Sequence, residues 1–134
     1  MRFKTLAQRH EAEIAEDFGG RVTAGSGAHT EKGDVWVQGK DRSEQGLWEF
    51  VIENKVTQAK SFSASLGIWQ KVKLEAQSLS SRARPLLAIR FADPTHPQDP
   101  EAETLEDLVV MSKDDLLELI EENQNLKETL RQKA

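Results

Sequence analysis

Glu53 and Lys55 have the residue types and the spacing for hydrolytic chemistry. They end a β-rich apolar run that begins at residue 47, and alternation along a strand puts both side chains on one face, about 6.6 Å apart along it. A second β-rich run, residues 35–37, precedes it across a polar stretch, which predicts a hairpin. The hairpin brings Asp34 beside Glu53, so two carboxylates are expected to converge near an ammonium group.

Such a pair of carboxylates predicts a Mg²⁺ site, which Mn²⁺ is also expected to fill. The chain has no cysteine and only three histidines, so oxygen ligands are expected. Mg²⁺ is commonly held by one or two protein carboxylates plus water and phosphate oxygens, which suits Asp34 and Glu53. The metal would activate water, while Lys55 would orient or help to deprotonate that water and offset developing negative charge.

The surrounding pattern predicts an α/β domain in which a mixed central sheet lies between helices. Apolar residues recur at helical spacing before Gly19-Gly20 and again before the buried strand that starts at Pro85. A glycine-containing loop leads into Asp34. The expected segments are a helix at 3–18, a short strand at 21–24, a loop at 25–27, a helix through 68–79 and a strand at 85–92.

The last 42 residues differ from this core, which we place at residues 1–92. A proline-rich acidic loop is expected at 93–105, followed by an edge strand through 108–111 and, after an N-cap at Ser112, a C-terminal helix. A seam with alternating three- and four-residue spacing runs along this helix, typical of a short parallel coiled coil. Its members are Leu116, Leu119, Asn123, Leu126 and Leu130. The helix either packs on its own domain or forms a dimer.

Charge is divided unevenly along the chain. The formal net charge is −5, but residues 1–92 carry a net +3 and residues 93–134 a net −8. A mildly basic body is compatible with binding phosphate. The N-terminus is interrupted by charges too often for a signal peptide or a membrane span, so a cytoplasmic protein without membrane contact is expected.

Four stretches give the chain a resemblance to the PD-(D/E)xK nucleases, in particular the archaeal-type Holliday junction resolvases. They are AGS at 24–26, GDV at 33–35, IENKVT at 52–57 and PLLAIRF at 85–91, within a resemblance that covers about residues 5–92. The resemblance implies a restriction-endonuclease-like fold, Mg²⁺-dependent hydrolysis of DNA, branched DNA as substrate and a homodimer. A phage, archaeal or bacterial setting would suit such a small nuclease.

The resemblance also assigns roles to individual residues. Asp34, Glu53 and the Asn54 carbonyl become metal ligands, and Lys55 becomes the catalytic lysine. A glutamate from the first helix is required as well: Glu11 fits best, because Ile14, Ala15 and Phe18 turn it toward the sheet, and Glu13 is the alternative. Expected DNA contacts are Ser26, Arg21, Lys32, Lys71 and Lys73.

Two positions depart from the family pattern. Gly33 replaces the proline of the motif, and Asn54 replaces the usual apolar residue between Glu53 and Lys55. The Asn54 side chain points to the opposite face, where a buried amide without a partner would cost roughly 1–3 kcal/mol. A restriction- or repair-type nuclease, and a non-catalytic nucleic-acid-binding module of the same fold, remain as alternatives.

Overall fold

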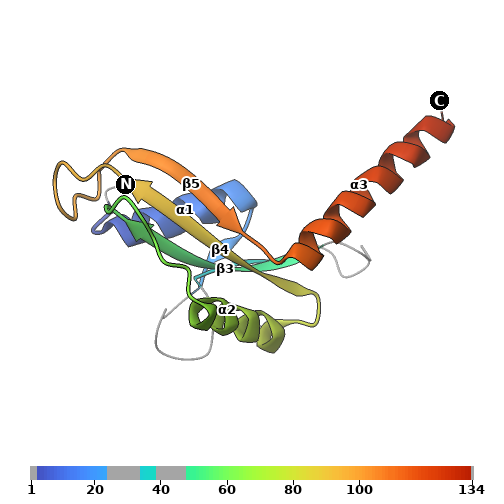
Figure 1. Ribbon diagram of the computed structural model, residues 1–134, viewed down its shortest axis with the longest axis horizontal. Coiled ribbons are helices and arrows are strands. Elements are labelled where there is room, and N and C mark those ends of the chain that lie inside the picture. The colour runs from blue at the N-terminus through green and yellow to red at the C-terminus, as the bar shows by residue number, and fades with distance from the viewer. Residues whose placement is uncertain (1–2, 24–33, 39–47, 134) are drawn as a thin grey trace.

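The computed structural model describes residues 3–23, 34–38 and 48–133. A helix lies at each end of the described chain and another lies between the two longest strands (Figure 1). In chain order they are α1 (Leu6–Phe18), β1 (Arg21–Val22), β2 (Val35–Val37), β3 (Glu49–Thr57), α2 (Leu66–Leu79), β4 (Ala83–Ala92), β5 (Thr104–Val110) and α3 (Lys113–Lys133).

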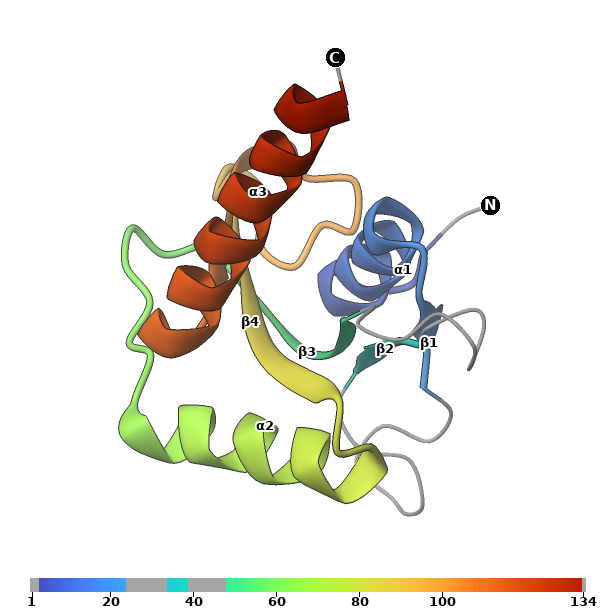
Figure 2. The ribbon, with the colours of Figure 1, turned by 90° about the vertical axis from the view of Figure 1, so that its right-hand side faces the viewer.

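The five strands form one mixed sheet in the order β1-β2-β3-β4-β5. β3 and β4 are parallel and are joined through α2, while the other neighbours are antiparallel. Alternate residues of β3 face different helices: Ile52 packs with Ile14 of α1, and Val51 packs with Val72 of α2. The predicted α/β architecture, a mixed sheet between helices (Figure 2), is therefore confirmed.

Two consecutive glycines fix α1 against β2. Gly19 ends the helix in the left-handed conformation with φ of 67°, and its N–H donates to the carbonyls of Ala15 and Glu16. At Gly20, an added Cβ would lie 2.8 Å from the carbonyl oxygen of Trp36. This close approach is open only to glycine, and it sets how α1 lies beside the strand that follows Asp34.

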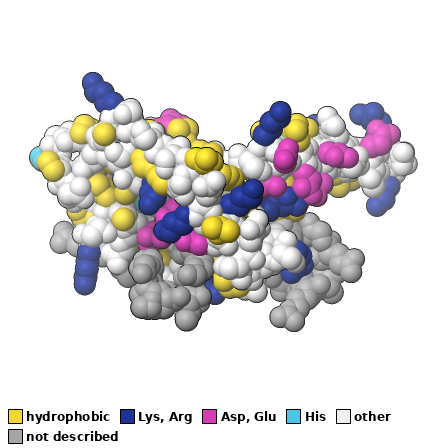
Figure 3. Space-filling model, turned by 60° about the horizontal axis from the view of Figure 1, so that its bottom comes forward, with side chains coloured by type: hydrophobic (Ala, Val, Ile, Leu, Met, Phe, Trp, Pro, Cys, Tyr) yellow, Lys and Arg dark blue, Asp and Glu magenta, His cyan; other side chains and the backbone are white. Residues whose placement is uncertain are grey.

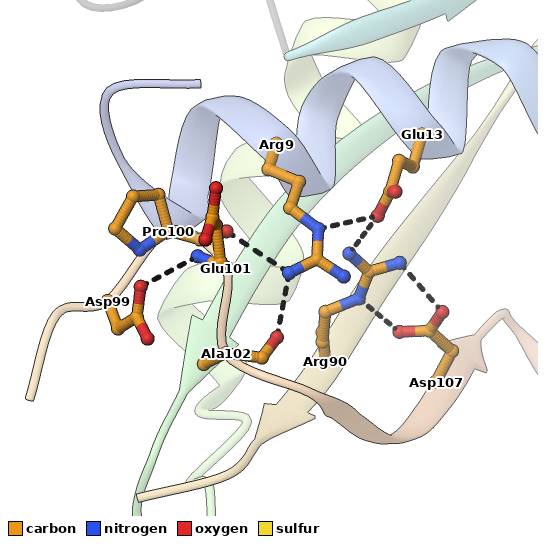
Figure 4. A network of polar contacts seen from close by, with 8 residues as sticks. All are labelled: Arg9, Glu13, Arg90, Asp99, Pro100, Glu101, Ala102 and Asp107. Carbon is orange, nitrogen blue, oxygen red and sulfur yellow. Dashed lines mark hydrogen bonds and ion pairs between the residues drawn. The ribbon is translucent and has the colours of Figure 1, made fainter. Parts of the chain in front are cut away.

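The segment after β4 belongs to the sheet more fully than expected. β5 begins at Thr104 rather than at 108, because it pairs along β4 from Leu87 to Ala92. The preceding loop is tied to α1 by Arg9, whose Nη1 donates to the carbonyls of Pro100 at 3.1 Å and Ala102 at 2.7 Å (Figure 4).

α3 projects from the body (Figure 1). It starts as expected, with the backbone N–H of Asp115 donating to the Ser112 hydroxyl at 3.1 Å. None of its described residues is buried, so it does not pack along its length on its own domain. None of the helices in the described ranges combines the length and the apolar character needed to cross a bilayer.

Candidate active site

Asp34 is held in place through its backbone and its side chain. Its N–H donates to the carbonyl of Ile52 at 3.0 Å, and its carbonyl accepts from the N–H of Thr23 at 2.9 Å. Its Oδ2 accepts a 2.7 Å hydrogen bond from the backbone N–H of Asn54. The carboxylate therefore lies against β3 next to Glu53, as the expected hairpin required.

Glu53 contacts two lysines. Lys55 Nζ lies 3.3 Å from Glu53 Oε1, and Lys71 Nζ from α2 lies 3.6 Å from the same oxygen. The Glu53 side chain is only 8% exposed, against 36% for Lys55 and 63% for Lys71. Glu53 and Lys55 thus share one face of β3 as predicted, and α2 adds a second ammonium group.

Glu11 is the α1 acid whose pKa is affected by the carboxylates of Asp34 and Glu53. Burial, and then the charges of Asp34 and Glu53, raise the pKa of Glu11 to about 7. Glu13 instead pairs with Arg90 and Arg9, which lower its pKa against the opposing effect of burial. The two candidates left open by the sequence are therefore separated: Glu11 belongs to the acidic group, and Glu13 to a network on another side of α1.

Asp34 also has an unfavourable environment for its charge. Burial is the largest cause and the Glu53 carboxylate adds to it, so the pKa of Asp34 rises to about 6, although the hydrogen bond from Asn54 and the charges of Lys55 and Lys71 oppose the rise. Carboxylates brought together at the expense of their ionisation are typical of a site that works with a cation or a shared proton.

The donor set fits a hard cation such as Mg²⁺. Asp34 and Glu53 each have one carboxylate oxygen engaged by the contacts above, Oδ2 and Oε1, which leaves the second oxygen of each as a candidate ligand. A strand residue directs its N–H and C=O to the same side, so the Asn54 carbonyl points to the Asp34 side of β3. Among the described residues, no three His, Asp or Glu side chains are clustered closely enough to form a metal site alone. Two carboxylates with water and phosphate suffice for Mg²⁺.

The expected DNA contacts fall into three groups. Ser26 and Lys32 lie outside the described residues. The guanidinium of Arg21 lies 5.1 Å from the ring centroid of Trp36 on the β1–β2 edge. Lys73 lines a cavity of about 410 Å³ between α2, the start of β4 and the start of α3, and is not among the residues that contact Glu53.

Lys71 lies closer to the carboxylates of the site than the sequence indicated. Its contact with Glu53 is the first cause of its raised pKa, and it also lies 3.7 Å from Glu75, one helical turn away. The i, i+4 pair of Lys71 and Glu75 was visible in the sequence, but a surface ion pair of this kind does not indicate which strand it faces. Figure 3, with the α2 side forward, shows acidic and basic side chains adjacent on the body.

The Asn54 side chain lies where the nucleases that the sequence resembles have an apolar residue. Its side-chain Oδ1 and Nδ2 are buried and have no hydrogen-bond partner among the described residues. The unpaired amide is expected to destabilise the fold by roughly 1–3 kcal/mol. The backbone N–H of the same residue donates to Asp34, so Asn54 takes part in the site through its main chain and not through its side chain.

No protein-family model matches the sequence, and no curated protein matches it either. The resemblance to PD-(D/E)xK nucleases therefore rests on the motifs and on the geometry described above.

Proposed function

We propose that this protein is a metal-dependent DNA endonuclease of the PD-(D/E)xK class, acting as a homodimer on branched DNA such as a Holliday junction. The observation that carries the proposal is the Asp34 carboxylate held against β3 beside Glu53, whose own carboxylate is contacted by Lys55 and Lys71. Metal-dependent hydrolysis of a phosphodiester uses acidic ligands for the cation and positive charge that offsets the developing charge on the phosphate. We propose a cytoplasmic setting for this activity.

The side chains divide the work by their positions. Asp34 and Glu53 would hold Mg²⁺ or Mn²⁺, with the Asn54 carbonyl beside them. When bound, the metal lowers the pKa of a coordinated water and stabilises charge on the phosphate. Lys55 would orient the attacking water and offset the charge that develops on the phosphate oxygens.

Glu11 and Lys71 complete the site. Because its pKa is near 7, Glu11 exchanges a proton readily at neutral pH, which suits it to accept a proton from a water or to ligate a cation in its ionised form. Lys71 neutralises Glu53 in the absence of DNA, and at 63% exposure its ammonium can turn toward a phosphate.

The test is cleavage of labelled four-way junction, linear duplex and single-stranded DNA at fixed salt, with Mg²⁺, with Mn²⁺ and with EDTA. Wild type is compared with Asp34→Asn and with Glu16→Gln, an exposed acid of α1 that serves as a control. We expect paired, symmetric cuts in the junction only, lost in EDTA and in Asp34→Asn and kept in Glu16→Gln.

Other outcomes have defined meanings. Metal-dependent cutting of linear duplex at least as fast as of the junction would retain the chemistry and replace the resolvase by a restriction- or repair-type nuclease. Binding of DNA without cutting under either metal would favour the non-catalytic module. Cutting that survives Asp34→Asn would overturn the site itself.

A further inference from the structure

Most of the large hydrophobic side chains that the described residues expose lie in the C-terminal third of the chain. Ten of the thirteen large hydrophobic side chains that the described residues expose lie between 105 and 130. They form a surface that we call the C-terminal apolar surface, made of Leu105, Leu108, Val109 and Val110 on β5 and Leu116, Leu117, Leu119, Ile120, Leu126 and Leu130 on α3. The ten side chains follow one another along β5 and α3, and exposed large apolar side chains gathered in this way are a common sign of a protein–protein contact.

We infer that one side of this surface is covered by a second copy of the same chain, with the two α3 helices side by side, parallel and in register. Leu117, about 150° around the helix from the side that meets the second copy, stays outside the contact. Along α3, Leu116, Leu119, Asn123, Leu126 and Leu130 occupy the alternating core positions of two heptads. All four of these leucines are between 43% and 59% exposed, so the seam is open.

Charge complementarity favours the parallel arrangement. If Leu116 and Asn123 occupy position a of the heptad, Glu122 occupies position g and Lys127 occupies position e. In a parallel pair, a g residue of one helix meets the e residue five positions later on the other helix. Each helix would therefore supply a glutamate to the lysine of its partner. In an antiparallel pair the same positions would bring glutamate against glutamate and lysine against lysine.

Asn123 favours the same arrangement. In a parallel, in-register pair it meets the Asn123 of the second copy, and the two amides can bond to each other. In an antiparallel pair it would face Leu119 or Leu126 and leave a buried amide unpaired. The residue is thus an independent indication of direction.

The way α3 leaves the body keeps the seam free. Its contacts with the body come from Asp115 and Glu118, which bind Arg84, and from Glu122, which accepts from the Trp48 indole N–H at 3.2 Å. These three residues lie about a quarter turn around the helix from the seam, since successive residues advance by 100°. Contacts with the body therefore hold α3 outward without covering the leucines.

β5 extends the contact toward the body. Leu108, Val109 and Val110 come directly before α3 on the unpaired edge of the sheet. A two-fold axis along α3 therefore passes close to them, and an open strand edge is itself a site for pairing. This addition matters, because two heptads alone are short for a stable coiled coil. α3 carries six acidic and four basic residues, so its net negative charge disfavours DNA as the occupant.

The test uses the full-length chain and measures mass by sedimentation, with circular dichroism to show that each variant is folded. The wild type is expected at twice 15.1 kDa at micromolar concentration. Leu126→Glu should raise the dimer dissociation constant at least about 100-fold, because it puts a charge into each side of the seam. Leu117→Glu, the same change on an equally exposed leucine outside the seam, should leave it within about threefold.

Two further measurements test direction. Glu122→Lys and Lys127→Glu should each weaken the dimer, and a mixture of the two should form a heterodimer that restores it. Because the chain has no cysteine, Leu130→Cys should form an intermolecular disulfide on oxidation, whereas Leu117→Cys should not.

A monomeric wild type at 100 µM would overturn the inference, as would a dimer that Leu126→Glu leaves intact. A dimer without heterodimer rescue and without the Leu130→Cys disulfide would overturn the parallel register. Mass is read without catalysis, so a dimer that cuts no DNA would refute the proposed function and leave this inference standing; Asp34→Asn should remain dimeric.

Discussion

Glu11 and Glu13 lie two residues apart on one helix, yet the structure gives them opposite environments. Glu13 binds the guanidinium groups of Arg90 and Arg9, and its pKa is lowered although burial opposes this. Glu11 faces two further carboxylates, and burial together with their charges raises its pKa to about 7. Arginine neighbours stabilise the charge of Glu13, whereas burial and acidic neighbours destabilise the charge of Glu11.

Glu13 is part of a structural network that joins three elements (Figure 4). Arg90, only 5% exposed, bonds Glu13 on α1 and both carboxylate oxygens of Asp107 on β5, at 2.8 and 3.0 Å. Arg9 adds the loop before β5 through two backbone carbonyls. The network fixes α1 and β5 onto β4, and in doing so fixes the position of Glu11.

The two environments distinguish an acid that stabilises the fold from an acid that is a candidate for chemistry. A buried carboxylate whose charge is balanced by a cationic partner stabilises the fold, whereas a carboxylate such as Glu11, whose pKa is raised by burial and by two acidic neighbours, stores an unfavourable energy that a cation would relieve. The following predictions test this contrast.

The largest expected difference concerns catalysis. Glu11→Gln should lower the cleavage rate by more than about 100-fold. Mutation of residues that only hydrogen-bond to a metal ligand typically lowers activity by roughly 10- to 100-fold. Glu13→Gln should keep the rate and lower only stability. Both variants would be measured at equal folded fraction on the same DNA substrate. Equal loss of rate in the two would show that the two acids do not differ in function.

The next effect is on stability. Arg90→Met should reduce the free energy of unfolding by about 2 kcal/mol, because Glu13 and Asp107 lose their shared partner; their 38% exposure limits the loss. Urea unfolding measures it, and Arg131→Met, at an exposed pair on α3, is the control expected to change little. An Arg90 variant as stable as the control would contradict a structural role for the network.

Metal binding should depend on the carboxylates around Asp34 and not on the network around Glu13. Mg²⁺ at about 100 times its dissociation constant should stabilise the folded protein by about 2.7 kcal/mol. The rise in Tm should be absent in Asp34→Asn and present in Glu13→Gln, each compared with Na⁺ at matched ionic strength. A rise of equal size in Asp34→Asn would place the metal elsewhere.

The smallest effect is a dependence on pH in the absence of metal. The folded pKa of Glu11, about 7, lies above its ordinary 4.5, so its ionised form destabilises the fold fully above pH 7, and this effect disappears as pH falls toward 4.5. Glu11→Gln should therefore raise Tm at about pH 8, with a gain that shrinks to nothing near pH 4.5. Glu16→Gln should show no such trend. A gain that grew as pH fell would have the wrong sign for a raised pKa.

Local patterns predicted most of the fold. Helical spacing before Gly19 and the apolar run from Pro85 correspond to α1 and β4, and Ser112 caps α3 as expected. The start of β5 was placed four residues late, because Leu105 to Asp107 do not form an apolar run and join the sheet by pairing with β4.

The sequence predicted the site residues that lie on β3 and in its hairpin with β2. It did not decide which residues α1 and α2 contribute to the site. Alternation placed Glu53 and Lys55 together, and a hairpin placed Asp34 beside them. The choice between Glu11 and Glu13, and the arrival of Lys71 at Glu53, depend on how α1 and α2 rotate over the sheet, which residue spacing limits only to about one side of each helix.

Three properties follow from residue types and their spacing alone. Any metal ligands must be oxygen or histidine nitrogen because the chain has no cysteine, Glu53 and Lys55 share one face of a strand, and the seam of the C-terminal helix contains one asparagine. Those properties are local, because they follow from residue type and from the period of a strand or a helix. The tertiary structure alone decided which acids are balanced and which are not, because an arginine such as Arg90 lies 77 residues from Glu13 in the chain and meets it only when β4 packs under α1. Electrostatic balance depends on distance in space, and only the folded sheet fixes that distance.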